Sequence, residues 1–229
     1  MMAEILHEMI EGRLNMKIIK PRVEFITPMN RLTGVVVMRR LEECGRTCYK
    51  SEDKITEGSY SNFLRGIIKR GHESVLEHAS VTVRFICDRG VSHEIVRHRI
   101  ASYSQESTRY CNYSGDAFDH EITVIEPCFF KPDTDAYRRW EEACNDAEDA
   151  YFDLLEYGAT PQEARSVLPN SLKTEVVMTA NIREWRHFFK LRCSKAAHPQ
   201  MREVATLALE HFYRNMPALF EDIYEEVKA

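Results

Sequence analysis

The feature that most limits the possible folds is the irregular order of strand-like and helix-like segments along the chain. Alternating apolar residues predict strands at 79–87 and 172–180, and helical spacing predicts helices at 32–48, at 134–157 and from Pro199 onward. These segments do not follow the regular strand–helix alternation of a parallel α/β sheet. The sequence therefore predicts an α+β fold, with mixed helices and a small central sheet.

Shorter segments complete this pattern. The stretch 16–26 is rich in β-branched residues, and because Pro21 interrupts it, we expect one edge strand or two short strands. Helical spacing predicts a helix at 60–69 and a short helix at 91–99. The residues at 101–115 are mostly polar, and we expect them to form a loop.

Two later helices begin at recognisable capping signals. Thr160-Pro161-Gln162-Glu163 has the spacing of a capping box with proline at the first helical position. Asn181-Ile182-Arg183-Glu184 is a similar start, and we expect its helix to run to about Arg192.

Composition and charge limit the classes of protein to which the chain can belong. With 229 residues, 44% of them hydrophobic, the chain can bury a core, and we expect one domain at 16–229 after an N-terminal extension at 1–15 that is poorly ordered. The formal net charge of −5 disfavours a general nucleic-acid binder. No apolar run is long enough to span a membrane. Seven cysteines without a secretory signal indicate reduced thiols and a cytoplasmic protein.

A dense group of hydrogen-bond donors lies between Arg97 and Tyr110. Arg97-His98-Arg99 is followed by hydroxyl and amide side chains and then by Arg109. Arginine offers a rigid fork of donors that matches phosphate oxygens. The segment therefore suits a phosphorylated, heteroaromatic ligand. A solvated helix end followed by a polar loop is the alternative, and composition alone leaves it open.

A second group of cations lies further along the chain. Its members are Arg165, Arg183 and Arg192, accompanied by Asn181 and His187. Because the chain has neither a P-loop nor a Gly-x-Gly-x-x-Gly fingerprint, a nucleotide would have to be held by such side chains. The alternative is a solvated cationic face made of Arg183, Arg186, Lys190 and Lys195.

The residues do not indicate a metal site or a catalytic nucleophile. His93 and His98 are five apart, whereas the zinc protease motif needs four so that both rings share one helix face. We therefore expect no metal. No cysteine lies in a nucleophile signature, and no Gly-x-Ser-x-Gly elbow surrounds Ser107.

Four blocks of the sequence resemble one known family. Arg97-His98-Arg99, seven residues and then Ser107 resembles the signature of the flavin-dependent thymidylate synthases. The segment 71–78, GHESVLEH, resembles the family's upstream block, and 165–169, RSVLP, its arginine-to-proline motif. Asn181, Arg183, His187 and Leu191-Arg192 resemble the last block. The resemblance covers about Met16 to Glu221, in order and with compatible spacing.

This resemblance implies a fold and a reaction. The fold would be that of the flavin-dependent thymidylate synthases, which is unrelated to classical thymidylate synthase. The reaction would be reductive methylation of dUMP to dTMP, with FAD relaying a hydride and no obligatory protein nucleophile. Carbon would come from 5,10-methylenetetrahydrofolate and electrons from NADPH. The family implies a homotetramer whose subunits share active sites, with no nucleic-acid or membrane partner.

The resemblance also implies roles for individual residues. FAD contacts would be made by His72, Ser74, Glu77, Arg97, His98, Arg99, Gln105, Asn181, Arg183 and His187. Contacts to dUMP would be made by Glu94, Arg97, Gln105, Glu106, Ser107, Thr108, Arg109, Arg165 and Arg192. Arg192 would be the catalytic residue, facing the uracil ring and favouring its ionised or enolate form. Ser104, Gln105 and His187 depart from the residues found in some members, which puts affinity in doubt more than activity. No role is carried over onto Lys195 or His198.

Two alternatives stay open at this point. A flavoprotein reductase or oxidase would use the same residues on another nucleotide without methyl transfer. A nucleotide-binding or RNA-binding module would use the arginines without flavin, and its binding would depend on salt.

Overall fold

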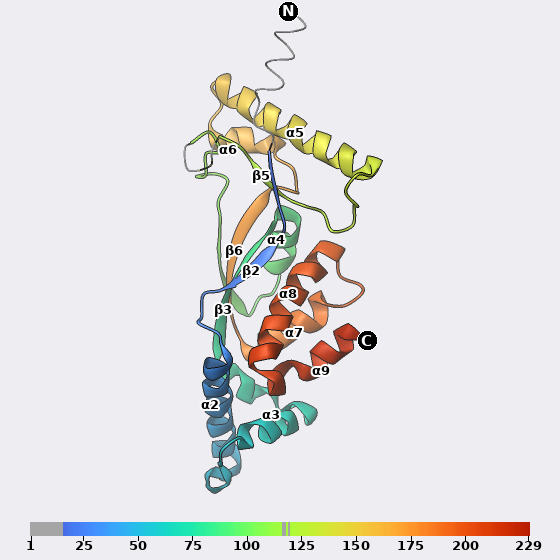
Figure 1. Cartoon of the computed structure of the whole chain (residues 1–229). Helices are drawn as coiled ribbons and strands as arrows, with labels where there is room; N and C mark the ends of the chain where they lie inside the picture. Colours follow the sequence, from blue (N-terminus) through green and yellow to red (C-terminus); the bar gives the residue numbers. More distant parts are fainter. Residues whose placement is uncertain (1–15, 116–117, 119) are drawn as a thin grey trace, which may run out of the picture. The chain divides into compact units, whose positions relative to one another are not determined.

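The computed structural model describes residues 16–115, 118 and 120–229, so the predicted extension at 1–15 lies outside the described residues. The chain forms two compact units. Figure 1 labels their helices and strands. Unit 1 contains Asp88–Gly90, Glu106–Thr174 and the segment that ends at Pro21. Unit 2 contains Arg22–Cys87, Val91–Gln105 and Glu175–Ala229. A single domain over 16–229 stays a prediction.

Unit 1 is built on a small parallel strand pair. Strand β1 (Lys17–Ile19) pairs with β5 (Thr123–Ile125), and the long helix α5 (Asp135–Glu156) belongs to the same unit. The core contains Met16, Ile122, Val124, Cys144, Tyr151 and Leu172. After α5 come the short helix α6 (Pro161–Ala164), which begins at the predicted capping box, and a 3₁₀ turn at Arg165–Val167.

Unit 2 contains a four-stranded sheet with the strand order β2-β3-β6-β4. The strands are β2 (Arg22–Phe25), β3 (Ser80–Asp88), β6 (Lys173–Asn181) and β4 (Ala101–Gln105). Strand β2 is antiparallel to β3, and β4 is antiparallel to β6. The predicted strands at 79–87 and 172–180 are therefore confirmed, as is the division of 16–26 into two strands at Pro21.

Strand β4 corrects the prediction of a polar loop at 101–115. Residues 101–105 form an edge strand that pairs with β6 from Ala101 opposite Ala180 to Gln105 opposite Val176. Ser102 and Ser104 are exposed at alternate positions, while Tyr103 between them is half-buried. An edge strand with one solvated face tolerates polar residues at every second position, so a serine-rich stretch is compatible with a strand.

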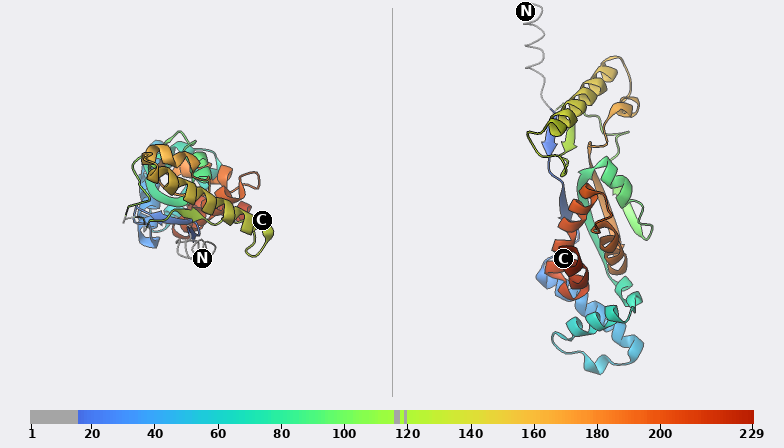
Figure 2. Two further views of the ribbon diagram at one scale, coloured as in Figure 1. Left: turned by 90° about the horizontal axis from the view of Figure 1, so that it is seen from above. Right: turned by 90° about the vertical axis from the view of Figure 1, so that its right-hand side faces the viewer.

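Helices cover the sheet of unit 2 and enclose an aromatic core. They are α2 (Arg31–Tyr49), α3 (Ser59–Lys69), α4 (Arg89–Ile95), α7 (Ile182–Arg192), α8 (Pro199–Asn215) and α9 (Pro217–Lys228), with 3₁₀ turns at Glu52–Lys54 and Glu73–His78. The views in Figures 1 and 2 agree that α2, α3, α8 and α9 lie side by side. Trp185 and Phe189 on α7 stack in the core at 5.8 Å between ring centroids. None of the described helices is long and apolar enough to cross a membrane.

Helix α4 is shorter than the sequence predicted. It ends at Ile95, so Arg97, His98 and Arg99 lie beyond the helix and not in its last turn. The Tyr103 hydroxyl lies 2.9 Å from the carbonyl oxygen of Ile95 and 2.7 Å from that of His98. This contact satisfies carbonyls at the end of the helix, where the intrahelical hydrogen bonds stop. Burial raises the pKa of Tyr103 to about 12, so its hydroxyl keeps its proton for this contact.

Candidate functional site

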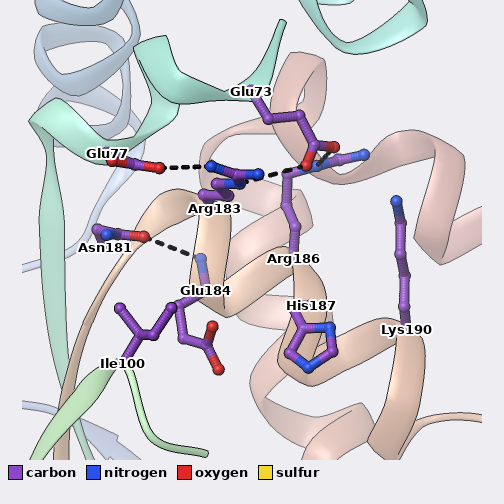
Figure 3. Close-up of a pocket in the computed structure, with 9 residues that line it drawn as sticks. All are labelled: Glu73, Glu77, Ile100, Asn181, Arg183, Glu184, Arg186, His187 and Lys190. Carbon is purple, nitrogen blue, oxygen red and sulfur yellow. Dashed lines mark hydrogen bonds and ion pairs between the residues drawn. The ribbon is translucent and has the colours of Figure 1, made fainter. Parts of the chain in front are cut away.

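Two adjoining cavities in unit 2 bring together many of the predicted site residues. The first has a volume of about 500 Å³, and Asn181, Arg183 and Glu77 are among the residues that line it (Figure 3). The second has a volume of about 670 Å³ and is lined by Arg97, His98, Arg99 and Arg192, among others. Ile100, Glu184 and His187 line both cavities.

Helix α7 supplies most of the shared wall. The Asn181 side chain caps the helix by accepting a hydrogen bond from the backbone N–H of Glu184 at 2.9 Å, as the sequence predicted. The positions 184, 187 and 191 recur at helical spacing and line the cavities. Trp185, Phe188 and Phe189 occupy the opposite face and lie in the core. The amphipathic pattern of one helix therefore orients the polar site residues.

Arg192 is held by three hydrogen bonds at the wall of the larger cavity. Its Nε donates to His98 Nε2 at 3.1 Å, Nη1 donates to the Glu94 carboxylate at 2.6 Å, and Nη2 donates to the Glu94 carbonyl oxygen at 2.9 Å. The Arg192 side chain is 14% exposed. A guanidinium has five N–H donors, so these contacts leave two for a ligand. The structure brings Glu94 and Arg192 together, as expected of neighbours in one site.

His98 is buried between this arginine and Glu184. Its Nδ1 lies 2.9 Å from Glu184 Oε1, and its side chain is 2% exposed. Burial lowers the pKa of His98, the hydrogen bond to Glu184 opposes this effect, and the nearby Arg192 charge reinforces it. The neutral form of the ring is therefore favoured.

Arg183 and Arg186 have different environments although both lie on α7. Arg183 is exposed, and its Nη1 donates to Glu77 at 2.6 Å. Arg186 is fully buried and donates to the Asp222 carboxylate at 2.6 Å and to the Leu219 carbonyl oxygen. The alternative of a solvated cationic face is therefore wrong for Arg186, because α9 covers it and supplies acceptors.

Arg97 and Arg99 are the exposed cations of the larger cavity. Within the part of the chain that the structure describes, neither guanidinium makes a hydrogen bond or an ion pair. Both are therefore available to an anionic ligand, and arginine forks are well suited to phosphate oxygens. Their positions support the predicted role of the triplet in holding a phosphorylated group.

The upstream block reaches the site only in part. Glu77 lines the smaller cavity, but His72 and Ser74, both exposed, are not among the described residues that line either cavity. The Tyr49 hydroxyl lies 2.6 Å from His72 Nδ1. Gln105 donates to the Ser92 hydroxyl at 2.9 Å. Contacts of His72, Ser74 and Gln105 with a ligand therefore stay predictions.

The other predicted residues form a separate group within unit 1. Arg165 Nη1 donates to the Thr108 hydroxyl at 3.0 Å, and the Ser107 hydroxyl accepts from the Arg109 backbone N–H at 3.3 Å. Lys173 donates to Glu106 Oε2 at 2.9 Å. These bonds shape a short loop, while the Arg109 and Arg165 side chains keep donors for an anion.

Two residues that contact or adjoin the site residues were not predicted from the sequence. Glu184 was interpreted as part of a helix start, and Tyr103 was placed in a loop. Glu184 is three residues from His187, a spacing that places both on one helix face and was available as a signal. The pairing of Tyr103 with two carbonyl groups has no sequence signal, because it depends on where β4 begins.

One cluster of potential metal ligands occurs among the described residues. Ligand atoms of His98, Glu184 and His187 lie within 4.8 Å of one another. Both ring nitrogens of His98 already take part in hydrogen bonds, so His98 lacks a free nitrogen for a metal ion. The absence of a metal stays a prediction.

Comparison with known proteins finds relatives that match most of the chain. Residues 37–218 match the family described as Thymidylate synthase complementing protein. A protein of Geobacter sulfurreducens named flavin-dependent thymidylate synthase is 38% identical over 184 residues, which are 77% of this chain and 78% of the relative. One of Corynebacterium aurimucosum with the same name is 34% identical over 202 residues, covering 80% of this chain and 79% of the relative.

A solved structure shares the fold. The crystal structure of a UMP/dUMP methylase, PolB, from Streptomyces cacaoi bound with 5-Br dUMP superposes with a TM-score of 0.72. The match covers 92% of this chain and 97% of that protein, at 23% sequence identity. The likeness supports the predicted α+β fold over nearly the whole chain.

Proposed function

The chain belongs to the flavin-dependent thymidylate synthase family, and on this premise we propose that it converts dUMP to dTMP. The methylene carbon of 5,10-methylenetetrahydrofolate is transferred to C5 of the uracil ring. Two electrons from NADPH reduce it to a methyl group, and tetrahydrofolate and NADP⁺ are released. The observation that supports the proposal most directly is the fixed Arg192 guanidinium at the wall of the larger cavity.

The donor set of unit 2 fits FAD. The cofactor carries a diphosphate, and Arg97 and Arg99 offer two cations without partners among the described residues. Arg183, Asn181 and His187 at the adjoining cavity add polar groups for the rest of the molecule. Bound FAD would supply the two-electron relay between NADPH and the nucleotide. In this proposal, the cavity residues hold and orient the cofactor.

Arg192 is the catalytic residue of this proposal. When C5 of uracil becomes nucleophilic, negative charge develops on the N3 and O4 side of the ring. A guanidinium that is already fixed by Glu94 and His98 stabilises this charge without reorganising. By analogy with a donor in an oxyanion hole, such a contact is worth about 3–4 kcal/mol.

The loop of unit 1 is proposed to bind the phosphate of dUMP. Arg109 and Arg165 supply charge, and Ser107 supplies a hydroxyl. Charge-assisted hydrogen bonds from arginine to phosphate are stronger than neutral ones. Glu106 and Thr108 shape the loop through Lys173 and Arg165.

No cysteine nucleophile is needed for this chemistry. Burial raises the pKa of Cys144 to about 11 and that of Cys193 to about 12, so both thiols stay protonated near neutral pH. None of the seven cysteines, all of which lie among the described residues, forms a disulfide. We further propose a cytoplasmic homotetramer whose subunits share each active site.

A reconstitution assay with omitted components tests the proposed function. The purified protein is loaded with FAD and incubated with dUMP, methylenetetrahydrofolate and NADPH, and dTMP is measured by chromatography. We expect dTMP only in the complete mixture. NADPH oxidation without dTMP would instead identify a flavoprotein reductase or oxidase. A protein that does not retain FAD but binds RNA in a salt-dependent way would identify a binding module.

A further inference from the structure

A buried carboxylate lies behind the catalytic arginine and has no role in the proposed function so far. Glu184 occupies the third position of α7, where a glutamate often bonds back to the N-cap backbone. Here its carboxylate accepts from His98 Nδ1 at 2.9 Å, and the residue is 7% exposed. Figure 3 shows the Glu184 side chain beside Ile100. Burying a carboxylate is costly unless it accepts a hydrogen bond, and His98 donates one to Glu184.

The hydrogen-bond directions determine the state of the imidazole ring. Arg192 can only donate, so His98 Nε2 must present its lone pair to Arg192 Nε at 3.1 Å. The remaining nitrogen, Nδ1, then carries the proton and donates it to Glu184. In the opposite tautomer, two N–H groups would face each other at Arg192 and a lone pair would face the carboxylate. The cationic form would oppose the arginine in the same way.

We infer that Glu184 is a positioning residue, which acts through His98 to hold the Arg192 guanidinium in its working orientation. The chain of contacts runs from the Glu184 carboxylate to His98 Nδ1–H, and from His98 Nε2 to Arg192 Nε–H. Glu94 fixes the other two nitrogens of the guanidinium. The inference rests on the proposed function for the role of Arg192, whereas the contacts stand on the geometry alone.

The same geometry changes the role expected of His98. Both ring nitrogens are used inside the protein, so neither is left for a hydrogen bond to flavin. The ring packs against Phe188 at 4.9 Å and His187 at 5.5 Å between centroids. His98 thus contributes to the site by orienting Arg192, as the middle residue in the series of contacts from Glu184 to Arg192.

The first test measures the ring state directly and needs neither flavin nor turnover. The protein is labelled with ¹⁵N-histidine and ¹⁵N-arginine, and His98 and Arg192 are assigned from the resonances that disappear in His98→Asn and Arg192→Lys. We expect one protonated nitrogen and one unprotonated nitrogen on His98 at neutral pH, and an Arg192 Nε–H signal protected from exchange. Fully protonated or Nε2-protonated His98 would overturn the inference.

Variants of Glu184 then separate positioning from simple burial. Glu184→Gln keeps an oxygen that accepts from Nδ1–H, so both signals should resemble those of the wild type. Glu184→Ala removes the acceptor, so the His98 nitrogen shifts should move and the Arg192 Nε–H should lose its protection. Unchanged signals in Glu184→Ala would show that Glu184 does not hold the chain of contacts.

Kinetics on the FAD-loaded holoenzyme complete the test. We expect Glu184→Ala to lower kcat for dTMP formation about tenfold or more, and Glu184→Gln to restore most of it. The matched control is Glu42→Ala, which removes another buried carboxylate of unit 2, paired with Arg46 on α2. This control should lose stability and keep kcat. Equal kcat in Glu184→Ala and Glu42→Ala would contradict the positioning role.

Failure of the proposed function can be distinguished from failure of the positioning role of Glu184. In that case the wild type would form no dTMP, while the histidine and arginine signals would still decide whether Glu184 holds His98 and Arg192.

Discussion

The cavity wall of unit 2 and the loop of unit 1 use arginine in opposite ways. Arg192 is largely buried, and three hydrogen bonds to Glu94 and His98 fix its guanidinium. Arg109 and Arg165 are exposed. Among the described residues, the Arg165 guanidinium donates a hydrogen bond to Thr108, and the Arg109 guanidinium lies over the Tyr110 ring at 5.6 Å from its centroid.

This difference indicates how each region would contribute to binding and catalysis. A guanidinium that is fixed before the ligand arrives can stabilise charge in a transition state, because no reorganisation is needed. Exposed arginines with spare donors contribute ground-state affinity for an anion, mostly through charge-assisted hydrogen bonds. Substitutions in the cavity wall should therefore lower kcat, and substitutions in the loop should raise KM.

The largest effect is expected from Arg192→Ala. Losing the fixed guanidinium should lower kcat for dTMP formation about 10²–10³-fold, while FAD absorbance after desalting stays at the wild-type level. Arg214→Ala, an exposed arginine of α8, is the matched control and should keep full activity. Turnover of Arg192→Ala close to that of the wild type would show that the fixed guanidinium does not act in the transition state.

A smaller effect on a different parameter is expected from Arg165→Ala. The loss of a charged donor to phosphate should cost about 1.5–3 kcal/mol, or about 10–100-fold in KM for dUMP. Steady-state kinetics at fixed FAD should show kcat nearly unchanged. Arg139→Ala, an exposed arginine of α5 paired with Glu142, controls for the loss of charge in unit 1. A fall in kcat with unchanged KM would remove the distinction between the two regions.

Ser107→Ala should have a weaker effect of the same kind. The hydroxyl itself carries no charge, so its hydrogen bond to the phosphate should lie at the lower end of the range for charged acceptors. Its loss should cost about 1.5 kcal/mol, or about tenfold in KM for dUMP. Measurable turnover at saturating dUMP is the expected result. Complete loss of turnover with normal dUMP binding, measured by calorimetry, would instead indicate that Ser107 forms a covalent bond during the reaction.

The smallest expected effect is a pH dependence of the stability that comes from His98 in the cavity wall. Burial lowers the pKa of His98 below its ordinary value of 6.5. The unfolded state therefore binds a proton more readily than the folded state. Above pH 6.5 the neutral ring does not lower the free energy of unfolding, and this free energy declines as pH falls from 6.5 toward the folded pKa. The groups that face His98 are Glu184, His187 and Arg192.

Urea unfolding of wild type and His98→Asn measures this decline. Between about pH 8 and about pH 5.5, the wild type should lose more stability than the variant, because the variant has no ring to protonate at this position. A variant that loses as much as the wild type would show that His98 is not held neutral.

The sequence predicted the elements of the site better than their contacts. Helix α7 and its Asn181 cap followed from local signals, since capping depends on residues three positions apart. The hydrogen bond from His98 to Glu184 joins residues 86 positions apart, so no local pattern contains it. Arg183 and Arg186 look alike in the sequence, and the acceptors on α9 decide that only Arg186 is buried.

Strand β4 shows the same limit at the level of the fold. Its serines favour a loop when taken alone, and pairing with β6 decides the outcome. The end of α4 depends on Tyr103 of that strand. The family resemblance identified most of the residues around the cavities, but only the folded chain shows that His98 links Glu184 to Arg192.

The most direct test of the central claim is anaerobic reduction of the flavin with and without dUMP. The protein is loaded with FAD, desalted and mixed with NADPH, and the visible spectrum is followed in both conditions. If flavin, reductant and nucleotide act together, the retained yellow band should bleach, and the rate should change when dUMP is present. A colourless protein after desalting, or bleaching that does not respond to dUMP, would contradict the claim.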